Sequence, residues 1–200
     1  MNETMMNITA EFTTAATKLS QIPDDGLPQV AFLGRSNAGK SSLLNALSGK
    51  KKLVRISSKP GKTREINFFK INQAFYLVDL PGVGFAGVDF NKMSEMENGI
   101  RAYVEKSKNL RGIIYLIDSK VGLQPIDVET IENVRAAGCP ILTVMSKCDK
   151  ANQSEQAKTR NAIQKILGND VKPLRLSVLK KVGMEEIWQE ILSTVAVEAK

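Results

Sequence analysis

The sequence contains no histidine and only two cysteines, and each shortage excludes a class of function. Without histidine there is no Ser-His-Asp triad, most zinc sites are excluded, and the commonest general base is missing. Cys139 and Cys148 are too few for a disulfide framework and lack metal-site spacing, which fits a reducing compartment. Any catalysis must therefore depend on positioning and charge.

Long apolar stretches are missing as well. No uninterrupted apolar run approaches the roughly 20 residues that a membrane span requires. The segment Met1–Met6 has neither the basic start nor the apolar core of a secretory signal, so we expect a cytoplasmic protein without a membrane span. The 200 residues, 42% of them hydrophobic, suit one domain with a full core, and we expect a monomer.

The charge balance is basic: 28 Lys and Arg less 21 Asp and Glu leave a formal net charge of +7. Such a surface favours polyanionic partners, either an RNA or an anionic membrane, but it equally serves solubility. Charge alone therefore does not establish RNA binding.

The first 20 residues show apolar side chains at steps of three and four. These are Met5, Ile8, Phe12, Ala15 or Ala16, and Leu19. The spacing predicts an amphipathic helix that packs on the domain. We therefore divide the chain into an N-terminal extension, residues 1–26, and a main domain, residues 27–200.

The main domain alternates short apolar runs with amphipathic stretches. Strands are predicted at 29–33, 65–71, 75–78, 112–117, 141–145 and 174–176, and helices at 41–47, 93–106, 128–137, 156–167 and from 185. The two-residue link at 72–73 implies that the second and third strands are antiparallel. The pattern predicts an α/β fold, with a mainly parallel six-stranded sheet, one antiparallel strand and helices on both faces.

A phosphate-binding pattern lies between the first of these strands and the first of these helices. It is the G-x-x-x-x-G-K-[ST] run Gly34, Arg35, Ser36, Asn37, Ala38, Gly39, Lys40 and Ser41. The glycines let backbone N–H groups approach phosphate oxygens, and the helix N-terminus adds positive potential. Lys40 is predicted to contact the β- and γ-phosphates, and the Ser41 hydroxyl to ligate Mg²⁺.

Two later segments complete a predicted magnesium and switch site. The D-x-x-G run, formed by Asp79, Leu80, Pro81 and Gly82, follows a strand at the carboxyl edge of the sheet. Asp79 can reach the Mg²⁺ shell, and the Gly82 N–H can meet the γ-phosphate. Thr63 lies in the preceding loop as the third predicted metal ligand, and its neighbours Gly61, Lys62, Arg64 and Glu65 join the predicted nucleotide-binding set.

The base-binding residues are predicted from two further segments. Ser146, Lys147, Cys148 and Asp149 occupy the place of an N-K-x-D signature, with serine in place of asparagine. The Asp149 carboxylate can accept from both guanine donors, N1–H and the 2-amino group, which adenine lacks. Lys147 can cover the base and reach back to the phosphate loop. Leu176, Ser177 and Val178 can offer N–H groups to guanine O6.

Five motifs in this order make the chain look like a translation-factor-type small GTPase with the P-loop GTPase fold. More narrowly, residues 34–43, 60–69 and 79–86 closely resemble the bacterial EngB family. The resemblance implies GTP/GDP binding with Mg²⁺, a role in assembly of the large ribosomal subunit through contact with the particle or its rRNA, and a need in cell division and septation. It also implies that Asn37 helps to hold K⁺ beside the phosphates.

Hydrolysis of GTP is expected to be slow and partner-stimulated. The position after D-x-x-G is Val83, whose side chain cannot orient water as a glutamine does. The predicted catalytic set is Lys40, Thr63, Gly82 and Asn37. Arg35 and Arg64 are weaker candidates for an arginine finger, better explained as solvated or structural charges. Two alternatives remain: a GTP-sensing module without important turnover, and an ATP-dependent kinase, for which we find no acceptor site or lid.

Overall fold

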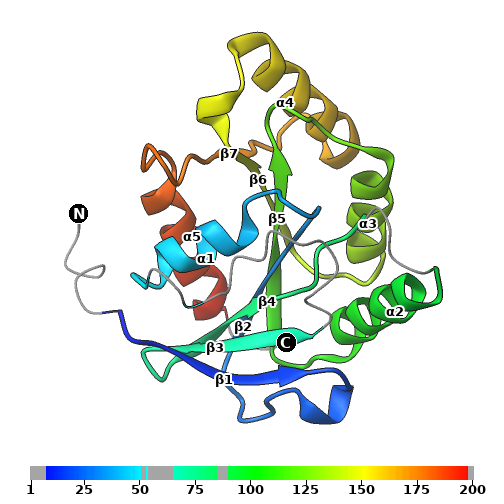
Figure 1. The fold of residues 1–200 in the computed structure, drawn as a ribbon, viewed down its shortest axis with the longest axis vertical. Coiled ribbons are helices and arrows are strands. Elements are labelled where there is room, and N and C mark those ends of the chain that lie inside the picture. The colour runs from blue at the N-terminus through cyan, green and yellow to red at the C-terminus, as the bar shows by residue number, and fades with distance from the viewer. Residues whose placement is uncertain (1–7, 51–52, 54–64, 85–89, 198–200) are drawn as a thin grey trace.

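The computed structural model describes residues 8–50, 53, 65–84 and 90–197, and these form a seven-stranded sheet with helices on both faces (Figure 1). The strand order is β1-β3-β4-β2-β5-β6-β7. The strands are β1 (Ala10–Ala16), β2 (Gln29–Gly34), β3 (Ile66–Ile71), β4 (Phe75–Asp79), β5 (Leu110–Asp118), β6 (Ile141–Ser146) and β7 (Leu174–Arg175). Only β3 runs against its neighbours among these strands. The α/β fold with one antiparallel strand is confirmed.

The N-terminal segment departs from the sequence prediction. Residues 10–16 form strand β1, not a helix, and pair antiparallel with β3 so that Ala10 faces Ile71 and Ala16 faces Ile66. The sheet therefore has seven strands instead of six. Phe12, expected on a buried helical face, is 56% exposed and meets the ring of Phe69 edge-on. Long-range pairing thus overrides the local helical spacing.

A bulge in β1 changes which of its side chains point to each face of the sheet. The register with β3 shifts between Phe12 and Thr14, which leaves one extra residue in β1. Residues separated by an even number share a face of a regular strand, but an extra residue inverts that relation. Accordingly Ala10 and Ala16, both buried, lie in the two different apolar clusters of the protein. This short edge strand therefore contributes a buried side chain to the apolar cluster on each face of the sheet.

Two groups of helices cover the two faces of the sheet (Figure 1). One face packs against α1 (Lys40–Leu47) and α5 (Met184–Ala196), through Leu43, Leu47 and Ile187 among others. The other packs against α2 (Phe90–Lys106), α3 (Pro125–Ala136) and α4 (Gln153–Leu167), whose buried side chains include Tyr103, Ile131 and Ile163. The buried strand β2 separates these clusters, since Val30 and Phe32 face one and Ala31 and Leu33 the other.

The parallel strands β4, β2, β5 and β6 place their carboxyl ends at one edge of the sheet. In such sheets the loops that leave this edge form the ligand site. The phosphate loop, the D-x-x-G run and Ser146–Asp149 all follow these ends. Within the described residues, no helix combines the length and the apolar character needed to cross a membrane.

Candidate nucleotide site

The phosphate loop runs from the end of β2 to the start of α1 in a backbone shape that needs glycine at both ends. Gly34 has φ +148°, and a Cβ there would lie 2.5 Å from the Leu116 carbonyl oxygen of β5. Gly39 caps α1 with φ +98°, a left-handed value that L side chains rarely adopt. The loop is therefore held tightly against the sheet, with the N–H groups at the start of α1 directed outward.

The phosphate-loop lysine and the D-x-x-G aspartate come together. Lys40 Nζ donates to Asp79 Oδ1 in a charged hydrogen bond, with both side chains largely buried. Ser41 follows Lys40 in the first turn of α1. The set consists of one carboxylate and one hydroxyl beside the phosphate loop, the hard oxygen donors that Mg²⁺ takes together with phosphate and water. The described residues therefore fit a Mg²⁺–nucleotide complex.

Residues 79–84, hereafter the D-x-x-G segment, contain the D-x-x-G run and are joined to the phosphate loop by backbone hydrogen bonds. The Leu80 N–H donates to the Phe32 carbonyl and the Val83 N–H to the Gly34 carbonyl, both at 3.1 Å, and the Ser36 N–H donates to the Val83 carbonyl at 3.3 Å. Leu80, Pro81 and Gly82 are buried, and Val83 is 3% exposed. Movement of either loop is thereby linked to the other.

Part of the predicted site lies outside the described residues. This holds for Gly61, Lys62, Thr63 and Arg64, and so for the third predicted metal ligand. Glu65 is described and lies exposed immediately before β3. The Lys40, Ser41 and Asp79 part of the site can be placed without this segment.

Ser146, which stands where the N-K-x-D signature has asparagine, faces the phosphate loop. Its residue is 1% exposed at the end of β6. The hydroxyl is 2.5 Å from the Ala38 carbonyl oxygen and 3.2 Å from that of Ile117. The serine therefore joins three segments of the site, namely β5, β6 and the phosphate loop.

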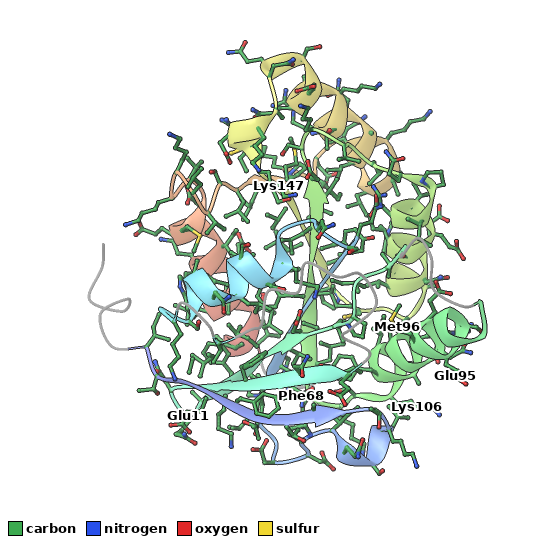
Figure 2. All side chains as sticks on the ribbon, in the orientation of Figure 1. Glu11, Phe68, Glu95, Met96, Lys106 and Lys147 are labelled. Carbon is green, nitrogen blue, oxygen red and sulfur yellow. The ribbon has the colours of Figure 1, made fainter. Side chains whose placement is uncertain are left out.

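Lys147 makes a second link between the base-binding segment and the phosphate loop (Figure 2). Its Nζ donates to the Asn37 carbonyl at 2.5 Å and to Asp118 Oδ2 at 2.8 Å. Lys147 and Asn37 both have positive φ, 52° and 66°, the left-handed region that side chains other than glycine rarely adopt. The Lys147 ammonium group is thus held by the phosphate loop and by Asp118.

Asp118 was missed by the sequence reasoning. It ends β5, and its Oδ1 also accepts from the Lys120 N–H at 3.0 Å and the Val121 N–H at 3.3 Å. Burial raises the pKa of its carboxyl, but the hydrogen bonds from Lys147 and the backbone outweigh this and lower the pKa overall. A signal was present, since Asp118 directly follows a buried apolar run, as Asp79 does.

The carboxylate of Asp149, predicted to select guanine, is exposed at the carboxyl edge of the sheet. A hydrogen bond from the Ser177 hydroxyl is the chief cause that lowers the pKa of this carboxyl below its ordinary value. Cys148 is buried, and its N–H donates to the Leu176 carbonyl at 3.0 Å. The two base-binding segments are therefore joined.

The residues after β7 offer fewer N–H groups than the sequence indicated. The Leu176 N–H donates to the Met145 carbonyl at 2.8 Å, and the Ser177 N–H to the Val182 carbonyl at 3.0 Å. Both groups are engaged within the protein. Of the three predicted donors, Val178 is the one whose N–H has no such acceptor in the described part of the chain.

Known proteins are similar to this chain over most of its length. The family model described as 50S ribosome-binding GTPase matches residues 29–147. A probable GTP-binding protein EngB of Solibacter usitatus is 41% identical over 191 residues, which cover 96% of this chain and 98% of the relative.

Two solved structures show the same fold. A crystal structure of a probable GTP-binding protein EngB aligns with a TM-score of 0.69 and 26% identity, covering 84% of this chain and 98% of the other. Era, solved with MgGDPNP and nucleotides of 16S ribosomal RNA, aligns with a TM-score of 0.67 and 26% identity, covering 84% of this chain and 56% of the other. The order of the motifs, the geometry of the phosphate loop and the full-length likeness agree: the chain belongs to the EngB family of GTP-binding proteins.

Proposed function

We propose that this protein is a slow GTPase that acts as a switch in assembly of the large ribosomal subunit. The observation that carries the proposal is the meeting of Lys40 with Asp79 beside Ser41, where a Mg²⁺-bound triphosphate would lie. The description of its family as 50S ribosome-binding and the net charge of +7 support a ribosomal partner. A role in cell division and septation would be either an indirect result of ribosome supply or a direct action of this protein.

Substrate binding depends on three groups of residues. The phosphates are held by the loop 34–41, and the base is selected by Asp149 with the Val178 N–H as donor to guanine O6. Ser41, Asp79 and Thr63 hold Mg²⁺, which when bound neutralises charge on the β- and γ-phosphate oxygens. Residues 61–65 complete the binding set. The hydrogen bond from Lys40 to Asp79 supports this set, because it brings a phosphate-loop residue next to a proposed metal ligand.

Hydrolysis in this proposal depends on positioning, because the sequence has no histidine, the commonest general base. Lys40 stabilises charge on the transferring phosphoryl group, and the Gly82 N–H meets the γ-phosphate. Val83 is buried against the core, so it cannot orient water. Turnover is therefore slow until a partner orders Thr63 and the D-x-x-G segment.

Asn37 is proposed to help hold K⁺ as a further source of positive charge. GTP hydrolysis should then be faster in K⁺ than in Na⁺ for the wild type, and the difference should vanish in Asn37→Ala. Equal rates in both salts would remove K⁺ from the proposal.

The test of the ribosomal role is cosedimentation of the purified protein with separated ribosomal subunits, loaded with GDP or with a non-hydrolysable GTP analogue. We expect binding to the large subunit in the analogue state only. Lys40→Ala should lose binding because it lacks a main phosphate contact. Binding in neither state would refute the ribosomal role while leaving GTP binding intact.

The alternative is a GTP-sensing module without important turnover, which the buried Val83 favours. Single-turnover hydrolysis with and without large subunits separates the two, since a sensor shows no stimulation. We further propose a cytoplasmic monomer in which residues 27–200 form the GTP-binding domain and 1–26 an extension that contributes β1. Deletion of residues 1–26 should leave GDP binding measurable.

A further inference from the structure

Arg35, the second residue of the phosphate loop, is half-buried. Its Nε is buried, and a Cβ added to Gly84 would lie 3.8 Å from that atom. The same Cβ would lie 3.3 Å from Ile126 Cγ2, in the first turn of α3. The Arg35 side chain therefore occupies the space where the D-x-x-G segment, α3 and the phosphate loop converge.

The buried Nε of Arg35 has no hydrogen-bond acceptor among the residues that the structure describes. The nearby carboxylate of Asp127 is already engaged: it accepts from the Tyr115 hydroxyl and from the Gln124 N–H, each at 2.9 Å. Burial raises the pKa of Asp127, and the charge of Arg35 partly offsets that rise. Arg35 is thus attracted toward α3 while its Nε–H is left without an acceptor.

The backbone of Arg35 is also bound to the D-x-x-G segment. Arg35 and Val83 form a parallel bridge, with the Val83 N–H donating to the Gly34 carbonyl and the Ser36 N–H to the Val83 carbonyl. Arg35 is therefore near the segment at two places: its backbone bridges Val83, and its Nε lies on the side of Gly84 where a Cβ would project. A cleft of about 210 Å³ between α2 and α3 reaches Val83 and Ile126, so the segment has room to shift.

We propose that Arg35 is a positioning residue that sets the D-x-x-G segment for the γ-phosphate, by donating its Nε–H to a backbone carbonyl of Val83 or Gly84 in the GTP-bound state. A buried donor without an acceptor disfavours the conformation that contains it, so a shift that supplies the acceptor is favoured. Gly82, one residue before Val83, is then drawn against the γ-phosphate. The inference rests on the proposed function as a GTP switch.

The experiment compares Kd for mant-GDP and for a mant-labelled non-hydrolysable GTP analogue in wild type, Arg35→Lys and Arg35→Gln. Arg160→Gln, which alters an exposed arginine on α4, is the control. Lysine keeps the charge but lacks the Nε–H. In both Arg35 variants we expect the preference for the analogue relative to GDP to fall about ten-fold or more, the effect of one charged hydrogen bond. Any loss of GDP affinity should be clearly smaller than the loss of affinity for the analogue.

Each outcome separates positioning from a general structural role. Equal weakening of both nucleotides, or loss of folding in both Arg35 variants, would overturn the inference in favour of a structural arginine. So would an unchanged preference in both. A wild type whose affinities do not depend on the γ-phosphate would refute the proposed switch itself, whereas a wild-type preference retained by the Arg35 variants refutes this inference alone.

Discussion

Replacing Ser146 by alanine tests the idea that this serine supports the phosphate loop. The hydroxyl is directed at the Ala38 carbonyl at 2.5 Å in a residue that is 1% exposed, so water cannot easily replace it. A buried carbonyl left without its donor costs about 1–3 kcal/mol. For a domain of this size each kcal/mol lowers Tm by roughly 2–4 °C, so we expect a fall of roughly 2–12 °C.

The assay is thermal unfolding at pH 7.5 with and without GDP, together with GDP affinity. Ser154→Ala, an exposed serine near the start of α4, is the matched control and should leave Tm within about 1 °C, the small effect usual for a surface change. GDP affinity of Ser146→Ala should fall because Ala38 belongs to the phosphate loop. If Ser146→Ala kept both Tm and GDP affinity, the serine would not support the loop.

Three further predictions follow from other contacts. Gly34→Ala should destabilise the protein by several kcal/mol or prevent folding, because its Cβ would lie 2.5 Å from a backbone carbonyl oxygen. The control is Gly99→Ala on α2, whose Cβ meets nothing within 4 Å and which should stabilise the protein by about 0.5–1 kcal/mol. Equal urea midpoints of the two variants would contradict this. Asp118→Asn should cost about 1–3 kcal/mol near neutral pH. Folding lowers the pKa of Asp118, so the stability that its carboxylate contributes is present above the unfolded value of 3.8 and disappears as pH falls through the folded pKa. The urea midpoints of wild type and variant should therefore converge in acid. A gap between them that does not depend on pH would refute this role of the Asp118 carboxylate. Asp149→Ala should reduce the preference for GDP over ADP by at least about ten-fold, measured by competition, since the guanine donors lose their acceptor.

Much of the site could be predicted because each motif lies directly after a strand. The apolar run before Gly34 and the one before Asp79 indicate buried parallel strands, whose carboxyl ends must meet at one edge. Local sequence and sheet geometry therefore suffice to place Lys40 near Asp79. The same reasoning, extended by one residue past Ile117, would have found Asp118.

The parts that failed depend on partners distant in the sequence. The helical spacing of Phe12 and its neighbours is real, but β1 is determined by pairing with β3, which no local pattern reveals. The direction of the Ser146 hydroxyl likewise depends on Ala38, 108 residues earlier. The burial of the Arg35 Nε could not be predicted from a motif in which that residue is variable.

The place of β1 in the sheet also constrains when the protein can fold during synthesis. Its strand partner is β3, so Ala10 meets Ile71 only after the ribosome has made the intervening phosphate loop and helix α1. Domains tend to fold as their segments emerge, at about 5–20 residues per second. Strand β1 must therefore remain unpaired for several seconds, until β3 has been synthesised and can pair with it.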